Sequence, residues 1–217
     1  MFFIHVPKTG GSSIERAHGY ESNHNGAPRE HGFVVLRHRN INELKQHLEN
    51  NAEEAPKYTF TVVRNVFERI ASTYRHYFRD RATPDFMTPE TYSYESYIEN
   101  LQRFHNNDDI EIRNERVYLA ENNDVPVANF RHLQPMDWWT EGLWGGCTFL
   151  RFETLNEDYK RHISPISGVE ELPHFNKAPK RIASIDAAAT EFTNSVIAKI
   201  FEAEIDRHGM RAPSVKV

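Results

Sequence analysis

Cysteine is almost absent from the sequence, and what the sequence lacks limits what the protein can be. Its single cysteine, Cys147, excludes an internal disulfide. No stretch approaches the ~18 apolar residues that a membrane-crossing helix needs. Positive charge is scarce as well, because 26 Lys and Arg stand against 31 Asp and Glu. The net charge of -5 argues against general nucleic-acid binding, so an anionic ligand would need a local basic cluster.

The first residues of the sequence show no pattern typical of a targeting signal. No charged segment and no long apolar run precede the strand expected at Phe2, so we expect no signal peptide. Together with the single cysteine, this favours a reducing, cytoplasmic setting. The 217 residues, 39% of them hydrophobic and 26% charged, are typical of a soluble globular protein, and we expect a single domain over 1–217.

Short apolar runs alternate with segments of helical periodicity along most of the chain. A strand beginning at Phe2 should lead into a helix near Ser12, and the apolar stripe of 66–78 should pack on the sheet. Strands alternating with helices imply parallel pairing and right-handed crossovers, so we expect an α/β fold. The further expected strands are 32–37, 58–63 and 147–152, and the further helices are 40–50, 66–78 and 156–163.

The pattern is weaker in the middle of the chain and returns near its end. A helix reaching Phe104 is plausible, but the segment 113–119 is ambiguous and the strands of 80–135 cannot be placed. Asp186 is expected to cap a long helix that ends at Gly209. The residues expected on the apolar side of that helix are Phe192, Val196, Ile200 and Phe201.

The glycine turn after the first strand is the chief candidate for a ligand site. Gly10 and Gly11 allow positive φ and a close approach of the backbone to a ligand, while Ser12 and Ser13 could cap the helix. Unpaired N–H groups at a helix start favour a phosphate, although the same residues could form an ordinary strand-to-helix turn. The turn is not the usual triphosphate loop G-x-x-x-x-G-K-[ST], because Lys8 comes before the glycines.

Two segments together resemble the cofactor motifs of the carbohydrate-type sulfotransferases (sulfotransferase family 2-like) that use 3′-phosphoadenosine 5′-phosphosulfate (PAPS). They are 4–13 (IHVPKTGGSS) and 63–75 (VRNVFERIASTYR), in the family's order. Weaker echoes are 151–155, 172–177 and a closing helix at 201–209. Val66 departs from the pattern, since the family usually has proline there. The resemblance implies a P-loop-like three-layer fold with a central, mainly parallel sheet flanked by helices, in which 80–145 is an acceptor-side insertion.

The resemblance also assigns binding residues. It implies that Lys8, Thr9, Gly10, Gly11, Ser12 and Ser13 wrap the 5′-phosphosulfate, and that Arg64 and Ser72 hold the 3′-phosphate. The position of Arg64 in the sequence supports this assignment, because it follows an expected parallel strand, where open α/β sheets bind ligands. Its guanidinium also offers a fork of donors that suits a phosphate. Lys8 is placed to stabilise the negative charge that develops on the oxygen between sulfur and phosphorus when the bond from that oxygen to sulfur breaks.

A histidine is favoured as the base that takes the proton from the acceptor hydroxyl, because its pKa suits transfer near neutral pH. His31 and His38 lie at opposite ends of the strand expected at 32–37, with Glu30 a distant third. His38 is at the carboxyl end, the ligand edge of a parallel sheet, and it also resembles the family's pattern. The choice fails if this strand runs antiparallel. The scheme needs no metal, and the histidines lack H-E-x-x-H or Cys/His ligand spacing.

The leading hypothesis is thus a sulfotransferase that uses PAPS and an acceptor hydroxyl, and the family resemblance implies a saccharide as the acceptor class. One alternative is a nucleotide-dependent phosphoryl-transfer enzyme, disfavoured because no G-K-[ST] with a magnesium-holding aspartate is obvious. Another is a non-catalytic adenine-nucleotide-binding module. The sequence does not give the acceptor or the oligomeric state.

Overall fold

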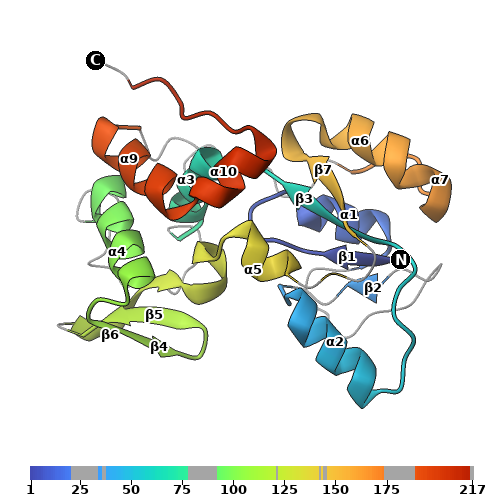
Figure 1. The fold of residues 1–217 in the computed structure, drawn as a ribbon, viewed down its shortest axis with the longest axis horizontal. Coiled ribbons are helices and arrows are strands. Elements are labelled where there is room, and N and C mark those ends of the chain that lie inside the picture. Colours follow the sequence, from blue (N-terminus) through green and yellow to red (C-terminus); the bar gives the residue numbers. More distant parts are fainter. Residues whose placement is uncertain are drawn as a thin grey trace. The chain divides into compact units, whose positions relative to one another are not determined.

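The computed structural model describes residues 1–20, 34–35, 38–77, 92–120, 122–141, 143, 146–173 and 189–215. The chain divides into two compact units, each built from two separate segments (Figure 1). Unit 1 comprises Met1–Arg64 and Pro135–Lys177, and unit 2 comprises Asn65–Gln134 and Ala178–Val217. The division does not test the expectation of a single domain over 1–217 with an insertion at 80–145, which stays a prediction.

Unit 1 contains a four-stranded sheet in the order β2-β1-β3-β7, and all three strand pairs are parallel. Phe3 lies opposite Phe60, and Val62 opposite Leu150, so these side chains share one face. The parallel arrangement expected from the sequence is therefore confirmed. The strands are β1 (Phe2–Ile4), β2 (Val34–Val35), β3 (Thr59–Val63) and β7 (Thr148–Arg151).

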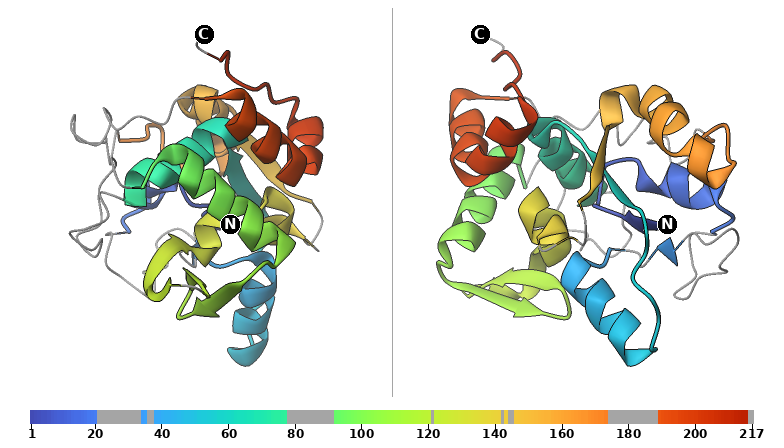
Figure 2. Two further views of the ribbon diagram at one scale, coloured as in Figure 1. Left: turned by 90° about the vertical axis from the view of Figure 1, so that its left-hand side faces the viewer. Right: turned by 45° about the vertical axis from the view of Figure 1, so that its right-hand side comes forward.

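Helices flank this sheet. The face that carries Phe3 and Leu150 packs with Ile14 of α1 (Gly11–Ala17) and Tyr159 of α6 (Leu155–His162) in one buried cluster. α7 (Ser164–Ser167) follows α6, and α2 (Ile41–Asn50) lies on the opposite side of the sheet in all views (Figures 1 and 2). Unit 1 also contains η3 (Phe152–Thr154) and the short helix α5 (Met136–Thr140), whose Trp139 is fully buried.

The expected helix over 40–50 is confirmed, and its start has a local cause. The side chain of Asn40 accepts a hydrogen bond from the Glu43 N–H at 3.0 Å, and the Glu43 carboxylate accepts one from the Asn40 N–H at 2.8 Å. This capping box satisfies two backbone donors and fixes where α2 begins. Its apolar positions Ile41, Leu44 and Leu48 are buried, as the helical spacing predicts.

Unit 2 combines helices with an antiparallel sheet in the order β4-β5-β6. This sheet accounts for the middle region whose strands could not be placed from the sequence. Its core joins residues of α3, α4, β5, β6 and α9. The elements are α3 (Val66–Tyr77), α4 (Tyr94–Asn106), β4 (Ile110–Arg113), β5 (Arg116–Leu119), β6 (Asn122–Asn129), η2 (Phe130–Leu133), α9 (Glu191–Ile200) and α10 (Glu202–His208).

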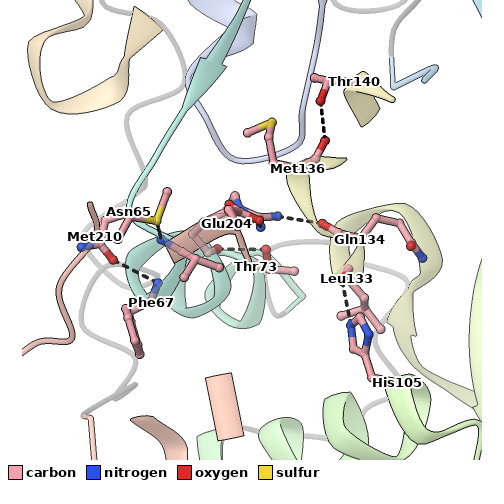
Figure 3. A network of polar contacts seen from close by, with 12 residues as sticks. Asn65, Phe67, Thr73, His105, Leu133, Gln134, Met136, Thr140, Glu204 and Met210 are labelled. Carbon is pink, nitrogen blue, oxygen red and sulfur yellow. Dashed lines mark hydrogen bonds and ion pairs between the residues drawn. The ribbon is translucent and has the colours of Figure 1, made fainter. Parts of the chain in front are cut away.

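A buried ion pair joins the two chain segments of unit 2. The Nη2 of Arg69, in α3, donates to both carboxylate oxygens of Glu204, in α10, at 3.1 and 2.9 Å. Its Nη1 donates to the Gln134 carbonyl at 3.1 Å (Figure 3). Arg69 and Glu204 are only 1% and 3% exposed, and a charge at such depth is tolerated because it is paired.

The C-terminal helix differs from the expected one. Thr190 caps α9 through a capping box with Thr193. α9 ends at Ile200, and the separate helix α10 begins at Glu202. Phe192 is 40% exposed instead of lying on the apolar side. The end at Gly209, which has φ 60, is as expected, and Asp186 lies outside the described residues. In the described part of the chain, no helix is long and apolar enough to span a membrane.

Candidate functional site

Three strands of unit 1 deliver the expected site residues to one edge of the sheet. Lys8 follows β1, His38 follows β2 and Arg64 directly follows β3. Because β1 pairs in parallel with both β2 and β3, all three strands end at the same edge. The choice of His38 depended on its strand running parallel to its neighbour, and this condition is confirmed. His31 and Glu30 lie outside the described residues.

The turn between β1 and α1 has an unusual backbone. Lys8 has φ 66 and Gly10 has φ 84, so two residues adopt the left-handed conformation. Thr9 lies between them with its side chain fully buried, and its Oγ1 donates to the Val6 carbonyl at 2.8 Å. The threonine hydroxyl thus stabilises the turn from inside, and a ligand would meet the Thr9 backbone. A lysine in this conformation costs about 1–2 kcal/mol relative to glycine.

The start of α1 corrects one expectation. Its N-cap is Gly10, which has no side chain, so the expected capping by Ser12 and Ser13 is wrong. Both serines are half-buried and lie within the first turn. No side chain at the cap position accepts from the first N–H groups of this helix. The Ser13 N–H donates instead to the Gly10 carbonyl at 3.0 Å.

Arg64 is tied to the same turn. Its Nη1 donates to the Lys8 carbonyl at 3.1 Å, and its guanidinium lies 4.4 Å from the centre of the Phe152 ring. A Cβ added at Gly10 would come within 3.1 Å of the same ring. Phe152 therefore supports both the arginine and the turn. Sequence reasoning assigned no role to Phe152, whose one signal was its place in the weak echo at 151–155.

A buried histidine and glutamate lie behind the turn. The Nδ1 of His5 is 2.5 Å from Oε1 of Glu15, and these residues are 3% and 4% exposed. The His5 ring also meets the ring of His38 edge-on, with centroids 4.7 Å apart. His38 itself is half-buried, with φ 54, and stands two residues before the N-cap of α2. Sequence reasoning missed His5 and Glu15 as site residues, although His5 belongs to the quoted motif.

Ser72 belongs to unit 2, where it is half-buried in α3. The buried face of that helix carries the predicted residues, but it packs in the core of unit 2 with α4 and α9, so the expected packing on the parallel sheet is wrong. The residues are Phe67, Ile70, Ala71 and Tyr74. Arg64 belongs to unit 1, so the pairing of Ser72 with Arg64 stays a prediction.

Two further observations concern possible metal ligands and the single thiol. Within the described ranges, no group of three or more His, Cys, Asp or Glu side chains could hold a metal ion. Burial raises the pKa of the Cys147 thiol to about 12, so near neutral pH it stays protonated and is a poor nucleophile.

Comparison with protein families gives one match. Residues 1–212 match the family model described as "Sulfotransferase family". No curated protein and no solved structure matches the chain. The matched range covers the turn after β1, the end of β3 and both units.

Proposed function

Since the chain belongs to the sulfotransferase family, we propose that it transfers a sulfuryl group from PAPS to a hydroxyl of a saccharide acceptor. One observation of the structure carries this proposal beyond the family. Lys8, His38 and Arg64 come from the carboxyl ends of three parallel strands, and Arg64 donates directly to the Lys8 carbonyl. Two cations and a histidine thus gather at the edge where open α/β sheets bind their ligands.

In the proposed reaction, the acceptor oxygen attacks sulfur while the bond from sulfur to the bridging phosphate oxygen breaks. Negative charge grows on the bridging oxygen, and the Lys8 ammonium is the group that stabilises it. Backbone N–H groups of Gly10, Gly11 and Ser12 donate to the sulfuryl oxygens, while the Ser13 N–H donates to the Gly10 carbonyl at 3.0 Å. The acceptor proton passes to His38, which acts as general base. The products are the sulfated acceptor and 3′-phosphoadenosine 5′-phosphate (PAP).

Arg64 is assigned to the 3′-phosphate of PAPS, the feature that separates PAPS from adenosine 5′-phosphosulfate. Its contact with Phe152 holds the guanidinium plane, which leaves a fork of donors with a fixed direction. The family resemblance alone assigns Ser72 to the same phosphate.

The test combines a binding assay with a transfer assay. Calorimetry should show binding of PAP and little binding of ATP, because ATP lacks the 3′-phosphate. A radiolabelled sulfate donor, incubated with a panel of polysaccharides, should label one class of acceptor, and the label should be lost with Lys8→Ala. Binding of ATP as tightly as PAP, together with no labelled acceptor, would instead favour phosphoryl transfer. PAP binding without any turnover would favour a non-catalytic module.

A further inference from the structure

The His5–Glu15 pair is buried behind the turn of the candidate site. His5 follows β1, and Glu15 lies in α1, so the pair closes the turn from behind. Both residues are almost completely buried, with Nδ1 and Oε1 2.5 Å apart. Burial of ionisable groups is costly, and replacing such a pair by apolar residues is often neutral or stabilising. Stability alone is therefore a weak explanation for this pair.

The free edge of the His5 ring contacts the turn. A Cβ placed on Gly11 would lie 2.2 Å from Cδ2 and 2.5 Å from Nε2 of His5, closer than real contacts allow. Gly11 is thus required at this position by the imidazole, and the imidazole in turn limits where the backbone of the turn can lie. Glu15 accepts from Nδ1 and fixes the plane of the ring.

The same ring also meets His38. The centroids are 4.7 Å apart with an angle of 73° between the planes, an edge-to-face contact. One imidazole therefore contacts both the backbone expected to bind the sulfuryl oxygens and the side chain expected to take the proton.

A second buried histidine, at the end of the helix that carries Glu15, shows what distinguishes His5. His18, at the end of α1, is 5% exposed, and its Nε2 is 2.7 Å from the Tyr159 hydroxyl. Tyr159 belongs to the hydrophobic cluster beneath the sheet, so this contact ties α1 to α6. His18 is an ordinary buried histidine with a hydrogen bond, and it provides a matched control.

We propose that His5, held by Glu15, is a positioning residue of the sulfuryl-transfer site that sets the imidazole of His38 relative to the Gly11 turn. This inference rests on the proposed function. Misplacing a reacting group by about 1 Å can cost on the order of a hundredfold in rate. Loss of His5 should therefore reduce turnover more than nucleotide binding, since the Arg64 contact to Lys8 does not pass through His5.

The experiment is a double-mutant cycle on the full chain, with His5→Gln, Glu15→Gln and His38→Asn alone and in pairs, and with His18→Gln as control. His5→Gln and Glu15→Gln should lower kcat roughly tenfold to a hundredfold and change the Kd of PAP by less than about threefold. The double variant His5→Gln/His38→Asn should have a kcat less than about threefold below that of His38→Asn alone. The reason is that His5 acts through His38, which is already replaced. His18→Gln should leave kcat unchanged.

An equal loss from His5→Gln with and without His38 would overturn the proposal. NMR of the histidine side chains provides a second test that does not depend on a turnover assay. The His38 imidazole signals, identified by their loss in His38→Asn, should shift in Glu15→Gln and stay in place in His18→Gln. If the wild type transfers no sulfuryl group, the proposed function fails while this NMR result still decides the positioning. Unmoved His38 signals would overturn it.

Discussion

Lys8 combines a strained backbone with the charge that the proposed reaction needs. Its φ of 66 is a conformation that glycine adopts without cost. A lysine is therefore kept here at the expense of stability, which is common at functional sites.

Two replacements of Lys8 should separate stability from transfer. Lys8→Ala and Lys8→Gly should both lower the transfer rate by on the order of 10²–10³, because each removes the stabilising charge. Lys8→Gly should have a free energy of unfolding about 1 kcal/mol higher than that of Lys8→Ala, because glycine relieves the backbone strain. It should therefore unfold at a higher urea concentration. Urea unfolding and turnover assays measure the two effects. Near-normal turnover in either variant would remove Lys8 from the proposed role.

Arg64 and Ser72 should determine the choice of donor. Arg64→Ala and Ser72→Ala should weaken the binding of PAPS far more than that of adenosine 5′-phosphosulfate, which lacks the 3′-phosphate. Arg64→Lys should recover only part of the selectivity, because an ammonium keeps the charge without the fork of donors. Calorimetry with both nucleotides checks this. Equal losses for both would indicate structural damage, a real concern for Arg64 because it also holds the Lys8 carbonyl.

Gly11 offers a direct test of the packing behind the turn. Gly11→Ala should destabilise the fold by about 1–3 kcal/mol, since its methyl group would overlap the His5 ring. In a His5→Ala background, the same change should cost much less. Gly168→Ala is the control, because a Cβ there meets nothing within 4 Å and only its φ of 73 is unfavourable. Its cost should be the same in both backgrounds, and all four values come from urea unfolding.

At the scale of elements, the direction of β2 decides the place of His38. Because β2 pairs in parallel with β1, the residue three positions after Val35 lies at the ligand edge. His38 also has φ 54, a conformation that asparagine tolerates better than most residues.

His38→Asn is therefore the preferred test of the base, since it removes the titrating ring and suits the backbone. The variant should still bind PAP but lose the part of the pH–rate profile that depends on a base with a pKa near that of histidine. His31→Ala should stay close to wild type. A normal profile in His38→Asn and an altered one in His31→Ala would show that the base was assigned to the wrong end of the strand.

The sequence predicted best the elements whose signals are local. Ile41, Leu44 and Leu48 follow a clear helical spacing, and β3 is a dense β-branched run, so both elements were placed to within a residue or two. The antiparallel strands of unit 2 were missed because β4 is largely exposed and carries a weak apolar signal. The break at Phe201 was missed because the apolar spacing continues across it. The His5–Glu15 contact joins residues ten positions apart through a turn, and no periodicity reports such a contact.

At the scale of the whole molecule, the net charge of -5 conceals a local excess of positive charge. Lys8 and Arg64 lie far apart in the sequence and are brought together because β1 and β3 are neighbours in the sheet. Composition alone argues against polyanionic partners, but it does not predict how the chain binds a small anion.

The stability of the protein should fall as the pH drops, in part through His105 of unit 2. Burial chiefly lowers its pKa, with the charge of Arg69 acting in the same direction and a hydrogen bond to the Leu133 carbonyl opposing both (Figure 3). The unfolded chain therefore binds the proton more readily, so stability is full above about pH 6.5 and is lost as the pH falls toward the lowered folded value.

His105→Gln should reduce this loss, because glutamine can still donate to the carbonyl and does not titrate. Urea unfolding at pH 7.5 and 5.5 measures the effect. His162→Gln, which changes an exposed histidine, is the control and should keep the wild-type pH dependence. An unchanged pH dependence in His105→Gln would assign the effect to other groups.

The interleaved segments of the two units have a consequence for biosynthesis. Domains generally fold as units as the chain leaves the ribosome, at about 5–20 residues per second. Here β7 supplies the fourth strand of unit 1 only after residues 65–134 have been synthesised. Glu204, whose carboxylate pairs with Arg69, is synthesised 135 residues after Arg69. Until then its guanidinium has to stay hydrated, because burying it without its partner would cost several kcal/mol. Translation of the last helix is therefore the step that allows unit 2 to close, and a ribosome that stalls before Glu204 would hold a chain with both units begun and unit 2 still open.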